Sequence, residues 1–327
     1  MSSSLHIVAE KPLVPLITVG ITCFNAAETI ERALQSAFEQ DWENKEIIVV
    51  DDASTDESFS IIESFALKNP NIRVIRHESN KGYPGALNTL LSEATGEFLA
   101  FFDDDDESRN DRLTLQWKRI IDYEQTTGSD MVFCYTNRLV VRREQKKPTT
   151  ITQAIGRSSP EPHGTAVSDF LLCLLEPPPF VWGQFGSCTL MVRRSVLLEL
   201  GGFDVSFRRC AEWDIAIRAG FKDGHFVAVD LPLVTQHLTP GIGSEKSGRA
   251  PLRYSLALRR KHRAYLLESG LYWASVAQAY ARFHYSRGER WRHRMFTGLA
   301  CLFAPTRLLQ QFLRRKARSG RKPSGKQ

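Results

Sequence analysis

The chain has 327 residues, 42% hydrophobic and 24% charged, so it can form one large domain or two domains with a buried core. Its net charge of +6 is unevenly distributed: residues 246–327 hold 20 basic and two acidic side chains, a balance of +18, whereas residues 1–245 carry −12. The six cysteines are scattered without a C-x-x-C pair, which argues against a zinc module or a disulfide scaffold and fits a reducing compartment.

The first part of the chain alternates between apolar runs and helical patterns. No basic region followed by a long apolar stretch opens the sequence, and no run approaches about 18 apolar residues, so we expect neither a signal peptide nor a transmembrane helix. Asn25 to Glu28 resembles a capping box, and Ser54 is expected to cap the next helix. Buried strands are predicted at 16–22, 46–52, 72–76 and 97–103, with helices between them and at about 110–125.

Strands that alternate with helices predict a parallel sheet with helices on both faces, in which ligands bind at the carboxyl ends of the strands. The later elements are less regular. The sequence predicts a strand pair at 131–137 and 138–144, a mobile loop at 144–166, glycine-ended helices at 193–204 and 211–220, a short strand at 225–230, a helical region at 249–290, an amphipathic helix at 291–313 and a disordered basic end.

Four consecutive aspartates, Asp103 to Asp106, follow the fourth strand. Two like charges about 4 Å apart repel by about 1 kcal/mol in water and about 4 kcal/mol at an effective dielectric constant near 20. A sheltered run of carboxylates therefore needs protonation, solvent or a cation. The run is either a solvated turn that caps the next helix or a divalent-metal site at a strand end.

The motifs VVDDASTD, NKGYPGALN, FFDDDD, GGFD and EWD, in this order and spacing, resemble those of family 2 glycosyltransferases with the GT-A fold. The resemblance covers roughly three quarters of the chain, to about residue 240. It implies an α/β fold with a Rossmann-like, mixed, mainly parallel sheet flanked by helices. Residues 1–245 are then the catalytic domain, with a nucleotide-sugar half (1–125) and an acceptor half (126–245), and residues 246–327 are a helical, basic extension.

A departing nucleoside diphosphate needs positive charge, and the hard cations Mg²⁺ and Mn²⁺ prefer carboxylate oxygens. The resemblance implies that Asp103 and Asp105 hold such an ion and that His237 lies near it, although a lone histidine is more often structural. The other residues expected to bind the nucleotide sugar are Thr22, Phe24, Asn25, Asp51, Asp52, Lys81, Gly82 and Asp104, with Asp103 shared. The alternatives are a helix cap for the Asp51 pair, a core position for Phe24 and an ordinary turn around Lys81.

The acceptor hydroxyl needs a carboxylate that takes its proton. The resemblance places this base in the run AEWD, where Glu212 stands for the usual aspartate of the family and Asp214 is its rival. Asp214 could instead bind the backbone or Arg218, one helical turn later. On family position alone, the expected acceptor residues are Trp182, Gly202, Phe203 and Asp204.

The resemblance therefore predicts a metal-dependent, inverting glycosyltransferase that moves a sugar from a nucleoside-diphosphate sugar, UDP favoured, to a hydroxyl of a glycan or lipid-linked acceptor in polysaccharide or cell-surface glycan synthesis. The basic amphipathic tail predicts docking on an anionic membrane surface, so a cytoplasmic, peripheral location on the inner face of the cell membrane is expected. Alternatively, the tail helices pack on the catalytic domain.

Two other functions remain as alternatives. A nucleic-acid-binding protein would use the basic tail but would leave the acidic strand ends unexplained, so no nucleic acid is expected. A sugar nucleotidyltransferase should carry a glycine-rich, basic loop after the first strand, and TCFNAAE is neither.

Overall fold

The computed structural model describes residues 14–142, 150–238 and 248–305. The strands are β1 (Ile17–Cys23), β2 (Lys45–Asp51), β3 (Ile72–Arg76), β4 (Phe98–Asp103), β5 (Glu107–Ser108), β6 (Val132–Arg142), β7 (Thr150–Thr152), β8 (Met191–Arg193) and β9 (His225–Leu238). The helices are α1 (Ile30–Phe38), α2 (Ser58–Lys68), α3 (Tyr83–Glu93), α4 (Arg112–Thr127), α5 (Thr165–Cys173), α6 (Arg194–Glu199), α7 (Ala211–Phe221), α8 (Ala250–Lys261), α9 (Arg263–Glu268), α10 (Tyr272–Ser286) and α11 (Arg290–Phe303).

The described strands form one mixed sheet in the order β3-β2-β1-β4-β8-β6-β9-β5, with β7 beside β6. The first four strands are parallel, and the register pairs Cys23 with Asp51 and Thr22 with Asp103. The carboxyl ends of β1, β2 and β4 therefore meet at one edge of the sheet. This confirms the predicted mainly parallel α/β sheet and brings the acidic strand ends together.

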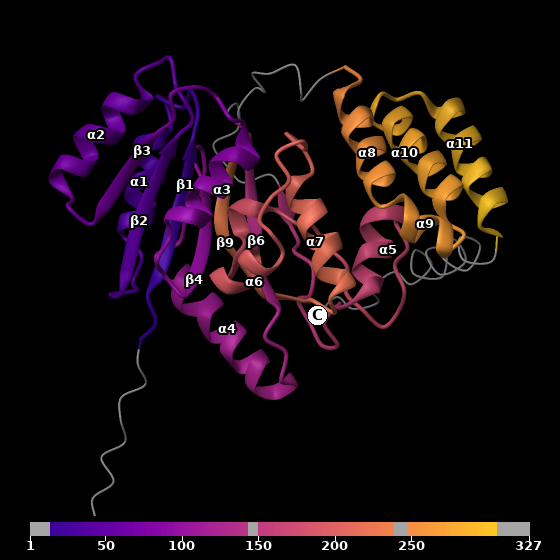
Figure 1. The fold of residues 1–327 in the computed structure, drawn as a ribbon, viewed down its shortest axis with the longest axis horizontal. Coiled ribbons are helices and arrows are strands. Elements are labelled where there is room, and N and C mark those ends of the chain that lie inside the picture. The colour runs from indigo at the N-terminus through magenta and orange to yellow at the C-terminus, as the bar shows by residue number, and fades with distance from the viewer. Residues whose placement is uncertain (1–13, 143–149, 239–247, 306–327) are drawn as a thin grey trace, which may run out of the picture.

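Helices cover both faces of the sheet (Figure 1). On one face, α1, α2 and α4 supply residues such as Leu34, Ile62 and Ile120 to a hydrophobic cluster. On the other face, α3, α5, α6 and α7 pack in a second cluster. β1 is buried along its whole length, as expected for a central parallel strand, and its hydrophobic residues Ile17, Val19, Ile21 and Cys23 all belong to the first cluster.

The C-terminal helices pack on the acceptor half. Tyr254, Leu258 and Ala274 belong to the same hydrophobic cluster as α5 and α7, and Figure 1 shows α8 and α10 beside these two helices. Arg259 is fully buried and donates to the carbonyl oxygens of Ser275 and Leu172, 2.8 Å each, so its guanidinium joins α8, α10 and α5. Burial lowers its pKa to about 10, which leaves it charged at neutral pH. The alternative in which the tail helices pack on the catalytic domain is therefore correct for α8 and α10.

Several local predictions were wrong. The predicted strand pair after residue 131 is the single strand β6, and part of the predicted mobile loop forms β7 against it. The side chain of Asn25 accepts a hydrogen bond from the Thr55 amide instead of capping α1, which has no side-chain cap. Ser54 likewise accepts from the Asn25 amide and does not cap α2. Gly220 does not end its helix as predicted but lies inside α7. It packs against Ser168 so closely that a Cβ at this position would meet the Ser168 hydroxyl.

Some predictions fall outside the described residues: the start of the loop predicted at 144–166, the domain boundary at residue 245, the continuation of the last helix beyond residue 305, and the basic end of the chain. Within the described ranges, every helix is too short or too polar to cross a lipid bilayer.

Candidate active site

A cleft of about 900 Å³ opens along the carboxyl edge of β1, β2 and β4. Its walls come from distant parts of the chain: the strand ends, the turn before α3, the first turn of α7, and the facing sides of α8 and α10. One cavity thus joins the predicted nucleotide-sugar half to the C-terminal helices.

Six of the residues predicted for the nucleotide sugar line this cleft, together with the predicted metal ligand Asp105. They are Thr22, Phe24, Asp52, Gly82, Asp103 and Asp104. Phe24 is 47% exposed, so it is not a core residue, and it lines the cavity. The Phe24 amide donates to Asp104 Oδ2 at 3.0 Å, which ties the loop after β1 to the acidic run.

Asp52 shapes the wall of the cleft near the start of α3. Its Oδ1 accepts from the Lys81 amide at 2.8 Å and lies 2.7 Å from His77 Nδ1, while its Oδ2 accepts from the Gly82 amide at 2.8 Å. A carboxylate oxygen can accept two hydrogen bonds, so Oδ2 keeps one acceptor position. Asp52 thus fixes the turn before α3 and also offers a hydrogen-bond acceptor to a ligand.

Three predicted donor-site residues, Asn25, Asp51 and Lys81, are not among the lining residues. Asn25 adopts a left-handed backbone (φ 52°) and ties its loop to Thr55. Asp51 is buried and accepts from the Ser54 amide, with Arg76 at 3.4 Å. Lys81 contributes its backbone to Asp52 and keeps an exposed side chain. These three residues support the loops that form the cleft.

The acidic run lies in a poorly hydrated environment. Burial raises the pKa of Asp104 to about 7, and burial together with the neighbouring carboxylates raises the pKa values of Asp103 and Asp106. Asp106 Oδ1 accepts from the His237 amide, whereas the buried Oδ2 has no hydrogen-bond partner among the described residues. The positive charge near the run, from Arg138 and Arg112, does not offset burial and the mutual repulsion of the carboxylates.

This donor set fits a hard divalent cation, since clustered carboxylate oxygens with an unpartnered buried oxygen are the ligands that Mg²⁺ and Mn²⁺ prefer. Asp103 and Asp105 both line the cleft, and Asp103 also lies within ligand distance of Asp106 and Cys188. The side chain of His237 is directed elsewhere: its Nε2 lies 2.7 Å from Glu107 Oε1, and it is not among the lining residues.

Glu212 lies in the first turn of α7 and lines the same cleft. Burial raises the pKa of its carboxyl group, and the charges of Arg209 and Arg138 partly oppose this. A carboxylate whose pKa is raised is a stronger base at neutral pH than a solvated glutamate. The charge of Arg138, on β6, also acts to lower the pKa of Asp103. This guanidinium therefore affects both the acidic run and Glu212.

Asp214, the rival base, is fully buried and is not a lining residue. Arg218 Nε and Lys261 Nζ donate to its carboxylate at 2.8 Å, and His262 Nε2 lies 3.0 Å from it. Burial alone would raise its pKa, but these partners outweigh burial and lower it. Asp214 therefore anchors α7 and α8, and its oxygens are occupied.

The four predicted acceptor residues are also outside the cleft lining. Trp182 stacks on Phe170 with ring centres 4.4 Å apart, and Phe203 packs edge-on against Phe101. The Gly202 carbonyl accepts from Arg218, and Asp204 pairs with Lys261 at 2.7 Å. Gly202, Phe203 and Asp204 thus hold the turn before α7, which sets the position of Glu212, whereas Trp182 packs on α5.

The opposite side of the cleft is formed mainly by residues outside the motifs, with Trp213 of EWD as the exception. Arg208, Arg209, Cys210 and Trp213 line it from the start of α7. Residues of α8 and α10 line it from the opposite wall: Pro251, Leu252, Ser255, Ala279, Arg282, Phe283 and Ser286. The two arginines shortly before AEWD were a feature of the sequence that could have indicated this wall of the cleft.

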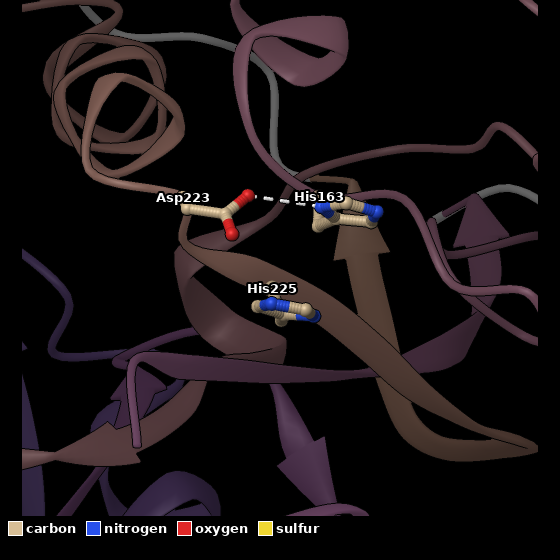
Figure 2. Close-up of side chains that lie close together, drawn as sticks. All are labelled: His163, Asp223 and His225. Carbon is tan, nitrogen blue, oxygen red and sulfur yellow. Dashed lines mark hydrogen bonds and ion pairs between the residues drawn. The ribbon is translucent and has the colours of Figure 1, made fainter. Parts of the chain in front are cut away.

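A second group of possible metal ligands, His163, Asp223 and His225, lies at the amino end of β9, opposite the strand ends that form the cleft (Figure 2). The two imidazole rings stack with centres 4.7 Å apart and planes 9° apart. Imidazole nitrogens bind metals through lone pairs in the ring plane, so stacked parallel rings do not direct them at one point. His163 Nδ1 lies 2.9 Å from Asp223, and His225 Nδ1 lies 2.8 Å from the Tyr123 hydroxyl.

Comparison with known proteins relates these features to a family. The family model described as Glycosyl transferase family 2 matches residues 18–173. The amylovoran biosynthesis glycosyltransferase AmsB of Erwinia amylovora is 26% identical over 244 residues, which cover 73% of this chain and 75% of that protein. The Escherichia coli enzyme WfaP, named a UDP-Glc:alpha-D-GlcNAc-diphosphoundecaprenol beta-1,3-glucosyltransferase, is 38% identical over 91 residues, 28% of this chain and 36% of that protein.

Among solved structures, residues 1–349 of S. aureus TarS in complex with UDP-GlcNAc match with a TM-score of 0.58 and 19% sequence identity, covering 83% of this chain and 72% of that one. At this identity the likeness concerns the fold. Taken together with the motifs and the cleft that they line, these matches show that residues 18–173 belong to glycosyl transferase family 2 and that the chain has the GT-A fold.

Proposed function

We propose that the enzyme transfers a sugar from a UDP-sugar, held together with a divalent cation, to a hydroxyl group of a glycan or lipid-linked acceptor, with inversion at the anomeric carbon. The relatives support a role in glycan synthesis: AmsB is named for amylovoran biosynthesis, and the name of WfaP gives a UDP-sugar donor and a diphosphoundecaprenol acceptor. TarS shares the fold and was solved with UDP-GlcNAc.

The observation that carries the proposal is the presence of Glu212 and the acidic run in one cleft. Transfer requires a base on one side of the sugar and a site for the leaving diphosphate on the other. Among the described residues, the raised pKa of Glu212 and its place in the lining distinguish it from Asp214, whose carboxylate is bound by three side chains.

In the proposed reaction, Phe24 stacks on the nucleobase and the free acceptor position of Asp52 Oδ2 binds its polar edge. The acceptor oxygen attacks C1 of the sugar, the bond from C1 to the diphosphate oxygen breaks, and Glu212 takes the proton of the acceptor hydroxyl. A divalent cation held by Asp103 and Asp105 would supply positive charge to the diphosphate.

Isothermal titration calorimetry with UDP, with and without Mn²⁺, tests the donor site. We expect UDP to bind more tightly with Mn²⁺, and the metal-dependent part to be lost in Asp105→Asn. Asp122→Asn, an exposed carboxylate on α4 outside the cleft, is the matched control and should bind like the wild type. UDP binding that is unaffected by Mn²⁺, or unaffected by Asp105→Asn, would contradict the metal site.

We further propose that α11 docks on an anionic membrane. Trp291 is 65% exposed and Leu302 76% exposed, and Met295 lies between them along the helix with a large exposed surface. Arg290, Arg292 and Arg294 surround this apolar strip, a combination typical of helices that lie on anionic lipid surfaces.

Co-sedimentation with phosphatidylglycerol vesicles tests the membrane contact. The wild type should sediment with these vesicles and much less with phosphatidylcholine vesicles, and Trp291→Ser with Leu302→Ser should abolish sedimentation. Leu67→Ser, at an exposed leucine on α2, is the control. Equal sedimentation of the double variant and the wild type would refute the role of α11.

A further inference from the structure

We propose that Arg282 of α10, positioned over Trp213 of α7, forms an acceptor subsite that binds the diphosphate of a prenyl-diphosphate-linked sugar. This inference rests on the proposed glycosyl transfer and names the class of acceptor. The subsite belongs to the C-terminal helices, which lie beyond residues 18–173, the part of the chain matched by the family model.

The geometry of Arg282 sets it apart from other arginines of the tail. Its guanidinium carbon lies 5.3 Å from the centre of the Trp213 ring, and both residues line the cleft. Stacking on an indole face holds a guanidinium flat and leaves its N–H groups available at the edge. Arg259, by contrast, uses its N–H groups on carbonyl oxygens of α5, α8 and α10.

Arg282 also lacks an anionic partner in the described part of the chain, where its side chain forms neither a hydrogen bond nor an ion pair. Although the side chain remains accessible, the walls of the cleft reduce its hydration enough to lower its pKa. A charged group in such a site is stabilised by an anion that enters the cleft. This end of the cleft is therefore suited to bind an anion.

The carboxylates of the active site do not neutralise this end. The pKa of Glu212 responds to Arg209 and Arg138, and that of Asp103 responds to Arg138, whereas Arg282 is not among the charges that act on either group. The pKa of Arg282 responds to burial and to Cys210, and no carboxylate is among the groups that act on it. The diphosphate of the donor belongs at the acidic run with its cation, so the anion at Arg282 is a second one.

Apolar side chains flank Arg282. Phe283 and Ala279, on α10 like Arg282, and Pro251 and Leu252 on α8 line the same cleft. An arginine fork matches phosphate oxygens in two-point contacts, and an adjacent apolar wall suits a hydrocarbon chain. A prenyl diphosphate carries both features, whereas inorganic phosphate and an uncharged lipid carry one each.

Calorimetric titration with geranyl diphosphate, in the presence of saturating UDP and Mg²⁺ and after subtraction of a protein-free titration, tests the subsite. The wild type should bind the probe, and Arg282→Gln should weaken binding by about tenfold to a hundredfold, as expected for the loss of charge-assisted hydrogen bonds. Arg282→Lys, which keeps the charge without the fork, should fall between them. Inorganic pyrophosphate and geraniol should each bind more weakly than geranyl diphosphate.

Arg260→Gln is the matched control, because this exposed arginine on α8 carries the same charge outside the cleft. Thermal unfolding of both variants should match the wild type. Equal binding by Arg282→Gln and the wild type, equal weakening in both variants, or equal binding of pyrophosphate and geranyl diphosphate would overturn the inference. Failure of geranyl diphosphate beside intact UDP binding overturns this inference alone, whereas failure of UDP to bind the wild type refutes the proposed function and this inference with it.

Discussion

Two groups of carboxylates in this protein have opposite environments. After β4, burial raises the pKa values of Asp103, Asp104 and Asp106, and one buried oxygen of the run has no partner in the described residues. Around α7, Asp204 and Asp214 share Lys261, and their pKa values are lowered. In the first group burial outweighs the nearby positive charge, whereas in the second group direct contacts with basic side chains outweigh burial.

This difference separates a binding site from a structural anchor. Both groups are acidic residues near a strand end or a helix start, and both match motif positions of the family. A carboxylate without basic side chains in direct contact can bind a cation or take a proton. A carboxylate bound by three basic side chains cannot do so without losing those contacts. Glu212, two residues before Asp214, belongs with the first group, because its pKa is raised and it lines the cleft.

The largest effect is expected for Glu212→Gln. Removal of a general base costs about 10² to 10⁴ in rate, so kcat should fall by that factor while calorimetric UDP binding is retained. Glu199→Gln, an exposed glutamate that pairs with Lys222, is the control and should keep full activity. A Glu212→Gln enzyme within tenfold of the wild-type kcat would remove Glu212 from the role of base.

Asp214→Ala should act on stability. Loss of a buried carboxylate leaves Arg218 and Lys261 without their shared partner, and breaking such a buried pair costs about 3–5 kcal/mol in the free energy of unfolding. Urea denaturation measures this cost, and Glu199→Ala should change the unfolding free energy by less than about 1 kcal/mol. A stable Asp214→Ala protein without activity would contradict the assignment of Asp214 as an anchor.

Asp104→Asn should stabilise the metal-free protein, and increasingly so at higher pH. The folded pKa of Asp104 is about 7, above the ordinary value of 3.8, so between these values the folded state holds the proton that the unfolded state has released. The wild type therefore loses stability as pH rises from about 4 to 7, and the variant lacks this loss. Melting temperatures at pH 5 and pH 8 measure the difference. A difference that shrinks at pH 8 would contradict the raised pKa, and Asp122→Asn should show no such trend.

Asp204→Asn should give the smallest effect, with the opposite dependence on pH. Burial alone would raise the pKa of Asp204, but hydrogen bonds from Lys261 and Ser206 outweigh it and lower the pKa to about 2. The stabilisation is present above the ordinary value of 3.8 and is lost as pH falls towards 2. The variant should be about 0.2–1 kcal/mol less stable at pH 6, and this deficit should shrink at pH 3. A deficit that is constant over this range in urea denaturation would refute the lowered pKa.

The nucleotide-sugar half was predictable because its signals are local. Apolar runs such as 46–52 form buried strands whatever lies beyond them, and the parallel arrangement carries the residue after each strand to the same edge. The acidic run, Phe24 and Asp52 were therefore expected together, and the structure places them in one cleft.

The acceptor half was less predictable because its outcome depends on distant residues. The sequence left Glu212 and Asp214 as rivals, and the partners that occupy Asp214, Lys261 and His262, come 47 and 48 residues later. The motif residues Gly202 and Asp204 matched the family, yet their contacts support α7 instead of lining the cavity.

The sequence by itself determined the order of strands and helices and the clustering of acids at one edge of the sheet, since hydrophobic periodicity and motif spacing are properties of neighbouring residues. Only the tertiary structure decided which carboxylates have raised pKa values and which are held by basic partners, and that α8 and α10 form the far wall of the cleft. Charge compensation and burial depend on which side chains come into contact from distant parts of the chain. These contacts cannot be predicted from the spacing of residues along the sequence.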